Sequence, residues 1–203
     1  MAMSGEVVRS ARPRLNGAER RGRFLDAAAR IVVETGPSAV TMDGVAARTG
    51  VNKRLPYRFF ENRDALLRDL LERELEESSR RTRALLPAEP SLEQRVAASV
   101  RVWLEIMNER GPLLSRLLFD QDVAAPLARE VNRRATQDWT QVYREALGVS
   151  DVTAEVVARI LLSALRGAVE ALHRQVAPLE EVAEIYTTLA LAAAREVARR
   201  RPG

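Results

Sequence analysis

The order of apolar and polar residues along the chain predicts an almost entirely helical protein. Apolar side chains recur every three or four positions, which is the period of a helix that buries one face. Such stripes run through residues 18–35 and 62–86. Further helices are predicted at 91–109, 112–119, 126–148, 150–176 and 178–200. Two short helices fit between 41 and 60 and no segment is typical of a strand, so the pattern indicates an all-α fold of about nine helices.

Residues that start or stop helices agree with this division. Gly36-Pro37 ends the first helix, and Ser91 with Gln94 forms a capping box that opens the helix at 91–109. The break Pro-Ala-Glu-Pro at 87–90 is a candidate domain boundary. The residues before it, 72–83, are highly charged, and we expect this half of their helix to be solvated.

Residues 41–60 are typical of two short helices joined by a tight turn. Thr41 is a suitable N-cap, and Gly50 accepts the left-handed backbone that the turn needs. Asn52 is placed to cap the second helix, whose cations can face outward. A helix-turn-helix presents side chains in this way to the major groove of DNA. The alternative is a helix pair of the kind found in many helical proteins that never bind DNA.

Positive charge is concentrated around this motif. Residues 1–60 hold 11 Lys and Arg against 5 Asp and Glu, a net charge of +6, whereas the whole chain carries +4. A patch of this sign attracts phosphates. The first residues can equally be a tail whose charge serves solubility. The arginines of this basic arm are Arg9, Arg12, Arg14, Arg20, Arg21 and Arg23.

Composition excludes several classes of site. The chain has no cysteine and a single histidine, His173, which excludes disulfides, thiolate metal sites and multi-histidine centres. No cluster of catalytic residues or Gly-rich phosphate loop is present, so we expect neither an enzyme nor a cofactor. The N-terminus lacks a signal-peptide pattern. The longest uncharged run near the end, 185–194, is too short to span a bilayer, and we expect a cytoplasmic protein.

From about residue 21 to 67 the chain resembles the tetracycline-repressor (TetR) family of bacterial transcription regulators. The resemblance lies in E-T-G-P-S-A-V-T-M, A-A-R-T-G-V-N-K and Y-R-F-F-E-N-R-D-A-L-L. It implies a homodimer with an N-terminal three-helix DNA-binding domain and a C-terminal helical domain that binds a small effector. The expected division is a basic flexible arm at 1–17, a helix-turn-helix domain at 18–62 and an effector-binding and dimerisation domain at 63–203.

The resemblance also implies roles for individual residues. Thr41 matches the residue that caps the second helix and touches a phosphate, Tyr57 matches a tyrosine that reaches the DNA backbone, and Arg63 holds the basic position at the start of the fourth helix. The residues that open the recognition helix are expected to read base edges or contact phosphates. The expected DNA-binding set is Thr41, Asn52, Lys53, Arg54, Tyr57, Arg58 and Arg63.

Two residues depart from the family pattern. Gly44 lies in the second helix, where a stronger helix former is usual and glycine costs up to about 1 kcal/mol. Pro56 lies in the recognition helix, where the family normally has an aliphatic or aromatic residue. A helix starting at Lys53 would lose its first internal hydrogen bond at Pro56. We therefore expect the helix to begin later or with a tighter opening turn.

The last two predicted helices carry wide apolar bands that favour a four-helix interface between two protomers. The alternative is that both helices fill the core of their own domain, and one side of each surely does. Gly167 and neighbouring alanines permit close approach. The band residues are Val156, Val157, Ile160, Leu161, Ala164, Leu165, Ala168, Val169 and Leu172, then Ile185, Leu189, Ala193 and Val197. His173 is interpreted as an interface or surface residue.

Aromatic residues in the second half of the chain suggest a mostly apolar effector cavity between the fifth to eighth helices. Core packing is the alternative for each of them. Arg166 and Glu170 are candidate polar groups beside the cavity, with an exposed ion pair as the alternative. The expected ligand-binding set is Trp103, Met107, Phe119, Trp139, Tyr143, Arg166 and Glu170.

Together these patterns predict a ligand-responsive repressor that binds a palindromic DNA operator as a homodimer through its last two helices. An unidentified small molecule would release it. A second hypothesis is a helical small-molecule sensor or carrier whose helix-turn-helix is vestigial, with Pro56 as its mark.

Overall fold

The computed structural model describes residues 16–119 and 125–200, and within these ranges it contains eight α-helices, two 3-10 helices and no strand. The elements are α1 (Gly17–Thr35), η1 (Pro37–Ala39), α2 (Met42–Thr49), η2 (Pro56–Arg58), α3 (Arg63–Leu85), α4 (Leu92–Glu109), α5 (Pro112–Phe119), α6 (Ala125–Leu147), α7 (Asp151–His173) and α8 (Leu179–Arg200). The predicted all-α fold class is confirmed, and none of the described helices is long and apolar enough to cross a membrane.

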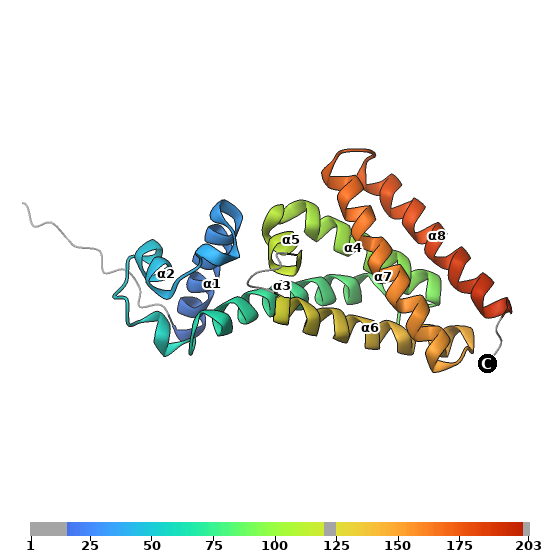
Figure 1. Cartoon of the computed structure of the whole chain (residues 1–203), viewed down its shortest axis with the longest axis horizontal. Coiled ribbons are helices and arrows are strands. Elements are labelled where there is room, and N and C mark those ends of the chain that lie inside the picture. Colours follow the sequence, from blue (N-terminus) through green and yellow to red (C-terminus); the bar gives the residue numbers. More distant parts are fainter. Residues whose placement is uncertain (1–15, 120–124, 201–203) are drawn as a thin grey trace, which may run out of the picture.

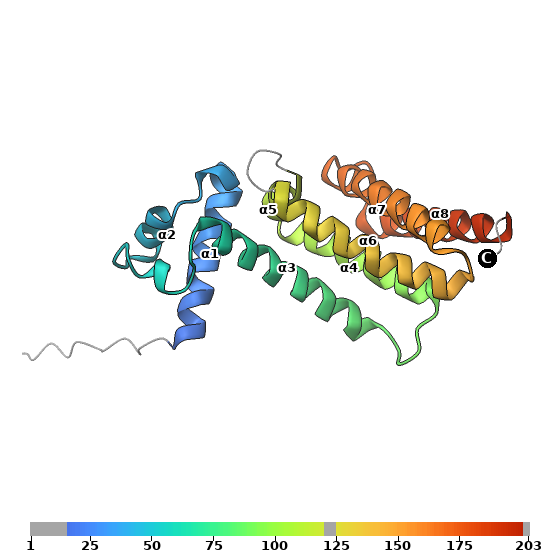
Figure 2. The ribbon, with the colours of Figure 1, turned by 60° about the horizontal axis from the view of Figure 1, so that its bottom comes forward.

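The helices form two groups that α3 connects. At one end α1 and α2 lie with η2 and the start of α3, and in both views α3 runs from there toward the remaining helices (Figures 1 and 2). α4 packs against α7 and α8, and α6 packs along α7. α7 and α8 lie at the end of the molecule opposite α2 (Figure 1). A helix shared by both groups is positioned to transmit a change in one group to the other.

Side-chain caps place the helix starts where the sequence predicts them. In the capping box of α4 the Ser91 amide donates to Gln94 Oε1 at 2.9 Å, and the Gln94 amide donates to Ser91 Oγ at 3.3 Å. Asn16 and Glu19 form a second capping box at the start of α1. Each box satisfies amides that have no partner within the helix.

The second helix of the 41–60 motif differs from the predicted α-helix. The only helical element after the turn is η2, of three residues, and the Leu55 amide donates to the Asn52 carbonyl at 2.8 Å in a tight i to i−3 bond. The cause is Pro56, which has no amide to donate to that carbonyl and allow an α-helical turn. The expectation of a tighter opening turn is therefore the one that agrees with the structure.

An aromatic cluster holds this segment against the first helix. The rings of Phe24 and Phe59 have centroids 5.5 Å apart, and those of Phe24 and Phe60 meet edge to face at 6.3 Å. Pro56 is buried beside them. Such pairs contribute about 0.5–1.5 kcal/mol beyond the area that they bury. These contacts thus hold the 3-10 turn against the core of the N-terminal group.

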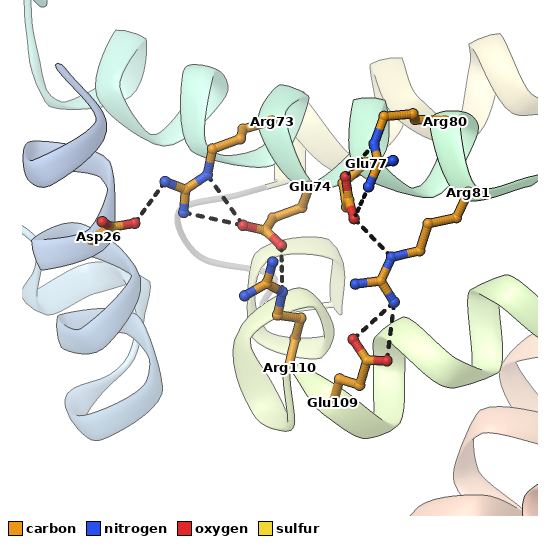
Figure 3. A network of polar contacts seen from close by, with 8 residues as sticks. All are labelled: Asp26, Arg73, Glu74, Glu77, Arg80, Arg81, Glu109 and Arg110. Atoms are coloured by element: carbon orange, nitrogen blue, oxygen red, sulfur yellow. Dashed lines mark hydrogen bonds and ion pairs between the residues drawn. The ribbon is translucent and has the colours of Figure 1, made fainter. Parts of the chain in front are cut away.

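The expectation that the charged half of α3 is solvated is wrong at Glu74, whose side chain is only 1% exposed. Its carboxylate accepts two hydrogen bonds from Arg73, at 3.3 and 3.1 Å, and Arg110 Nε lies 2.9 Å from the other oxygen (Figure 3). Arg73 also donates to Asp26 of α1 at 2.8 Å. The two arginines compensate the buried charge, which would otherwise be very unfavourable.

Candidate DNA-binding surface and effector cavity

The start of α2 is held by a side-chain cap. Thr41 has an extended backbone, and its hydroxyl oxygen accepts a hydrogen bond from the Gly44 amide at 3.0 Å. A Cβ atom added to Gly44 would lie 2.9 Å from that oxygen, which is too close for a normal contact. The glycine that departs from the family pattern therefore accommodates the cap. The exposed Thr41 lies at the positive end of the α2 dipole.

The 3-10 segment exposes cations to solvent, whereas its Pro56 is buried. Asn52 Oδ1 accepts from the Arg54 amide at 2.9 Å, which shapes the turn that carries Lys53 and Arg54. Both cations and Arg58 are exposed, and no described residue forms an ion pair with any of them. Tyr57 is 54% exposed. Long unpaired cations on a fixed backbone can approach a polyanion without breaking an internal ion pair.

Other arginines of the N-terminal group are engaged within the protein. Arg63 donates from Nη2 to the Pro37 carbonyl at 2.7 Å, which ties η1 to the start of α3. Arg48 pairs with Glu34, and Arg21 pairs with Asp69 while its guanidinium lies 5.3 Å from the centroid of the Phe60 ring. The expected phosphate contact of Arg63 stays a prediction. Among the arginines of the basic arm, Arg9, Arg12 and Arg14 lie outside the described residues.

A cavity of about 1190 Å³ opens between α3, α4, α6 and α7. Of the residues expected there, Trp103, Trp139, Tyr143 and Arg166 line it. Leu67, Leu71 and Leu75 of α3 and Tyr186 of α8 also line it, and they are absent from the sequence-based set. The leucine stripe of α3 was visible in the sequence, but its continuation beyond the N-terminal core was the only signal that it faces a second space.

Three of the expected ligand-binding residues are not among those that line the cavity. Met107 is fully buried, and its carbonyl oxygen lies 3.5 Å from His173 Nε2. Glu170 forms an exposed ion pair at 2.7 Å with Arg174, the C-cap of α7, because that arginine lies four residues away in the favourable direction. The side chain of Phe119, at the end of α5, lies outside the described residues.

Two tyrosines, Tyr143 and Tyr186, line the cavity. Tyr143 is 4% exposed, and its ring lies 5.5 Å from the ring of Trp139. Burial, and then the neighbouring Tyr186, raise the pKa of Tyr143 well above the ordinary value. The Tyr186 hydroxyl donates to the Leu161 carbonyl at 2.6 Å, and burial raises its pKa to about 12. Both phenols therefore stay protonated at neutral pH.

The apolar bands of α7 and α8 divide between the core and the surface. Val157, Leu161 and Val169 are buried, as the core alternative requires. On the outer side of the two helices several large apolar residues remain accessible, and a single exposed valine or leucine would need no explanation. These side chains, with their exposed fractions, are Val156 (49%), Ile160 (61%), Ile185 (51%) and Leu189 (65%).

Polar contacts join the two groups of helices. Arg116 of α5 donates to the carbonyl oxygens of Val32 and Val33, at 2.8 and 2.9 Å, at the end of α1. The Val32 carbonyl also accepts from the Gly36 amide at 3.0 Å, and a cation at the C-terminal end of a helix is favoured by the helix dipole. The Asp26–Arg73–Glu74–Arg110 network forms a second connection (Figure 3). The N-terminal group is thus bonded to elements that surround the cavity.

Comparison with known proteins agrees with this geometry. Residues 24–70 match the model of "Bacterial regulatory proteins, tetR family". The chain is 32% identical over 109 residues to the HTH-type transcriptional activator FasR of Mycolicibacterium smegmatis, a match that covers 54% of this chain and 49% of that protein. The chain therefore spans about half the length of the curated relative that it matches.

Solved structures share the fold over nearly the whole chain. A TetR-like transcriptional regulator from Rhodococcus sp. RHA1 superposes with a TM-score of 0.69 at 17% identity, covering 89% of this chain and 98% of that one. A putative transcriptional regulator from Pseudomonas aeruginosa PAO1 gives 0.74 at 18% identity, covering 93% and 96%. These relatives are regulators of transcription and not enzymes. The N-terminal match assigns residues 24–70 to the tetR family of bacterial regulatory proteins, and the fold is shared over nearly the whole chain.

Proposed function

We propose that this protein is a homodimeric transcription regulator that binds a palindromic DNA operator and is released from it by a small, mostly apolar effector. The observation that carries the proposal is the exposed set of unpaired cations, Lys53, Arg54 and Arg58, within a TetR-type DNA-binding domain. Counterion release by such cations provides affinity, and contacts to base edges provide specificity. The cytoplasm is the expected location.

Dimerisation supplies the second half of the DNA contact. Large apolar side chains of α7 and α8 are exposed. Both helices lie at the end of the molecule opposite α2, so an interface there leaves the cations free for DNA (Figure 1). A two-fold axis through this face duplicates the cationic segment. Two segments about 34–36 Å apart reach successive major grooves on one side of a duplex, so the operator should be a near-palindrome.

Effector response rests on α3. The same helix lines the cavity through Leu71. Its first residue, Arg63, donates a hydrogen bond to the Pro37 carbonyl. A ligand that fits the cavity better when α3 is displaced would favour a conformation whose two DNA-binding groups no longer match the groove spacing. Such a shift requires different affinities of the ligand for the two conformations.

We propose repression as the outcome, because release by an effector then turns transcription on. The curated relative is named an activator, so the sign of regulation needs its own measurement. Transcription in vitro from a promoter that carries the selected operator should fall when the protein is added. An increase would replace repression with activation and leave the DNA-binding proposal in place.

The first test is selection of binding sites from random DNA duplexes, followed by gel-shift titration with the full chain. The double variant Lys53→Ala plus Tyr57→Phe should bind the selected operator about tenfold more weakly, since one base or phosphate contact contributes about 1–3 kcal/mol. Its slope of log affinity against log salt should be shallower by about 1.

The control is Arg101→Ala, which removes an exposed arginine of α4. It should leave operator affinity unchanged, and thermal unfolding should show that both variants are folded. Equal operator affinity for wild type and the double variant would contradict the assigned DNA surface.

The second candidate function is a small-molecule carrier with a vestigial helix-turn-helix. The observation that favours it is the replacement of an α-helical recognition element by the three residues of η2. Failure to select any duplex sequence, together with no binding of DNA at low ionic strength, would favour the carrier. Salt-dependent binding to a selected near-palindrome would exclude it.

A further inference from the structure

The lining of the cavity includes a phenol without a protein partner. Tyr143 is 4% exposed, and no described residue forms a hydrogen bond with its hydroxyl, although the residue lines the cavity. A ligand that brings an acceptor to this hydroxyl gains a hydrogen bond without breaking one inside the protein. The neighbouring phenol of Tyr186 is already used, because it donates to the Leu161 carbonyl at 2.6 Å. Tyr143 is therefore the phenol of the cavity that is available to a ligand, and the indole N–H groups of Trp103 and Trp139, which also line it, likewise have no acceptor among the described residues.

Aromatic and aliphatic residues pack beside Tyr143. Burial, the larger cause, and the neighbouring Tyr186 raise the pKa of Tyr143. Trp139 packs against its ring, and Ala158 and Leu161 line the same cavity. A carboxylate placed here would lose its hydration without gaining a cation, which is unfavourable. A carbonyl, ether or ester oxygen loses little by comparison and satisfies the phenol.

The lining of the cavity includes five acids and five arginines, so it has no excess of positive charge that would select an anion. Acids and arginines are mixed along its lining, and Arg134 is engaged by Glu130 at 2.7 Å. Burial of apolar surface against the α3 leucines and the two tryptophans therefore provides most of the affinity, and one polar contact provides orientation.

We propose that the effector is an uncharged, mostly apolar molecule whose neutral acceptor oxygen receives a hydrogen bond from the Tyr143 hydroxyl. This inference rests on the proposed effector response and specifies its chemistry. It excludes fully ionised effectors from the inner part of the cavity. It also predicts that the contribution of Tyr143 depends on whether the ligand carries an acceptor.

The test is a thermodynamic cycle with two probe molecules of the same shape. 2-Decanone carries a carbonyl oxygen, and 2-methyl-1-decene has a methylene group in its place. Binding to the full chain is followed by tryptophan fluorescence, which is selective because Trp103 and Trp139 are the only tryptophans and both line the cavity. Tyr143→Phe should weaken the binding of 2-decanone about three- to tenfold, as expected for one neutral hydrogen bond. It should leave the alkene within about twofold.

Two controls separate this contact from changes in folding. Tyr186→Phe removes a phenol from the same cavity, but one whose hydrogen bond is internal, so it should lower thermal stability and leave the ketone-to-alkene ratio of affinities unchanged. Decanoate, which is ionised at neutral pH, should bind the wild-type protein more weakly than 2-decanone. Equal effects of Tyr143→Phe on ketone and alkene, or tighter binding of decanoate, would overturn the inference.

The same probes distinguish this inference from the proposed function. If the alkene or decanoate binds and releases the protein from its selected operator, but Tyr143→Phe has no ligand-dependent effect, the regulator proposal stands and the acceptor contact is wrong. If 2-decanone binds through Tyr143 but operator binding never changes, the contact stands and the effector response is wrong. Absence of binding by every probe would overturn the acceptor contact.

Discussion

Replacing Glu74 with alanine is expected to lower the free energy of unfolding by about 2–3 kcal/mol, because hydrogen bonds to charged groups contribute about 1.5–3 kcal/mol each. The carboxylate is 1% exposed and joins Arg73 to Arg110. Removing one member of a buried pair can cost about 3–5 kcal/mol. Here the side chains of the two arginines are 33% and 44% exposed, so water replaces part of what they lose and the lower figure applies.

Urea denaturation followed by circular dichroism measures this difference. The matched control is Glu76→Ala, since Glu76 lies two residues further along α3 but is exposed, and a surface substitution of this kind stays within about 0.5 kcal/mol. Glu74→Gln keeps the shape and one acceptor oxygen, so its effect should fall between the two. A Glu74→Ala variant as stable as the control would show that the network of Figure 3 contributes little to folding.

The position of Glu74 could not be predicted from sequence. Residues 72–83 contain a dense run of charges, and such runs are usually solvated, so the pattern alone favours exposure for every member. Burial results from the end of α4, where Arg110, 36 positions further along the sequence, reaches the carboxylate. Local composition contains no information about which charged residue a distant helix will cover.

Local signals predicted the helices well because caps and glycine turns act within a few residues. The capping box at Ser91 and the left-handed Gly50, with φ of 67°, are both found in the structure. In the recognition segment, by contrast, the local signals disagreed with one another. Pro56 signalled a tighter turn, since the missing amide is a local property, but the motif pattern still favoured an α-helix over 52–60.

The lining of the cavity was predicted from the sequence only in part. Trp103, Trp139 and Tyr143 were predicted from aromatic spacing and line it, whereas Met107 has the same helical spacing but faces the core. Spacing identifies a face of one helix, but it does not tell which space that face borders. Tyr186 was missed for a related reason, because its role depends on how α8 packs against α4 and α7.

Introducing a charge at Leu189 should dissociate the dimer and, with it, operator binding. Leu189 of α8 is 65% exposed and Ile160 of α7 is 61% exposed, so in the single chain neither side chain contributes to the core. The double variant Ile160→Glu plus Leu189→Glu would place four carboxylates in the interface of a symmetric dimer, where desolvation and repulsion both oppose association. The fold of each protomer should remain intact.

Sedimentation velocity should then show a monomer where the wild type is a dimer, and thermal unfolding should show whether the protomer remains folded. Operator affinity should fall at least about 100-fold, since linking two DNA-binding groups raises affinity by about 10²–10⁴ without any new contact. Arg101→Glu, a charge change on an exposed residue of α4, is the matched control and should stay dimeric.

A double variant that remains a dimer would exclude α7 and α8 as the interface. A wild-type protein that is monomeric yet binds the palindrome tightly would instead remove the two-fold axis from the DNA-binding proposal, because one cationic segment would then suffice.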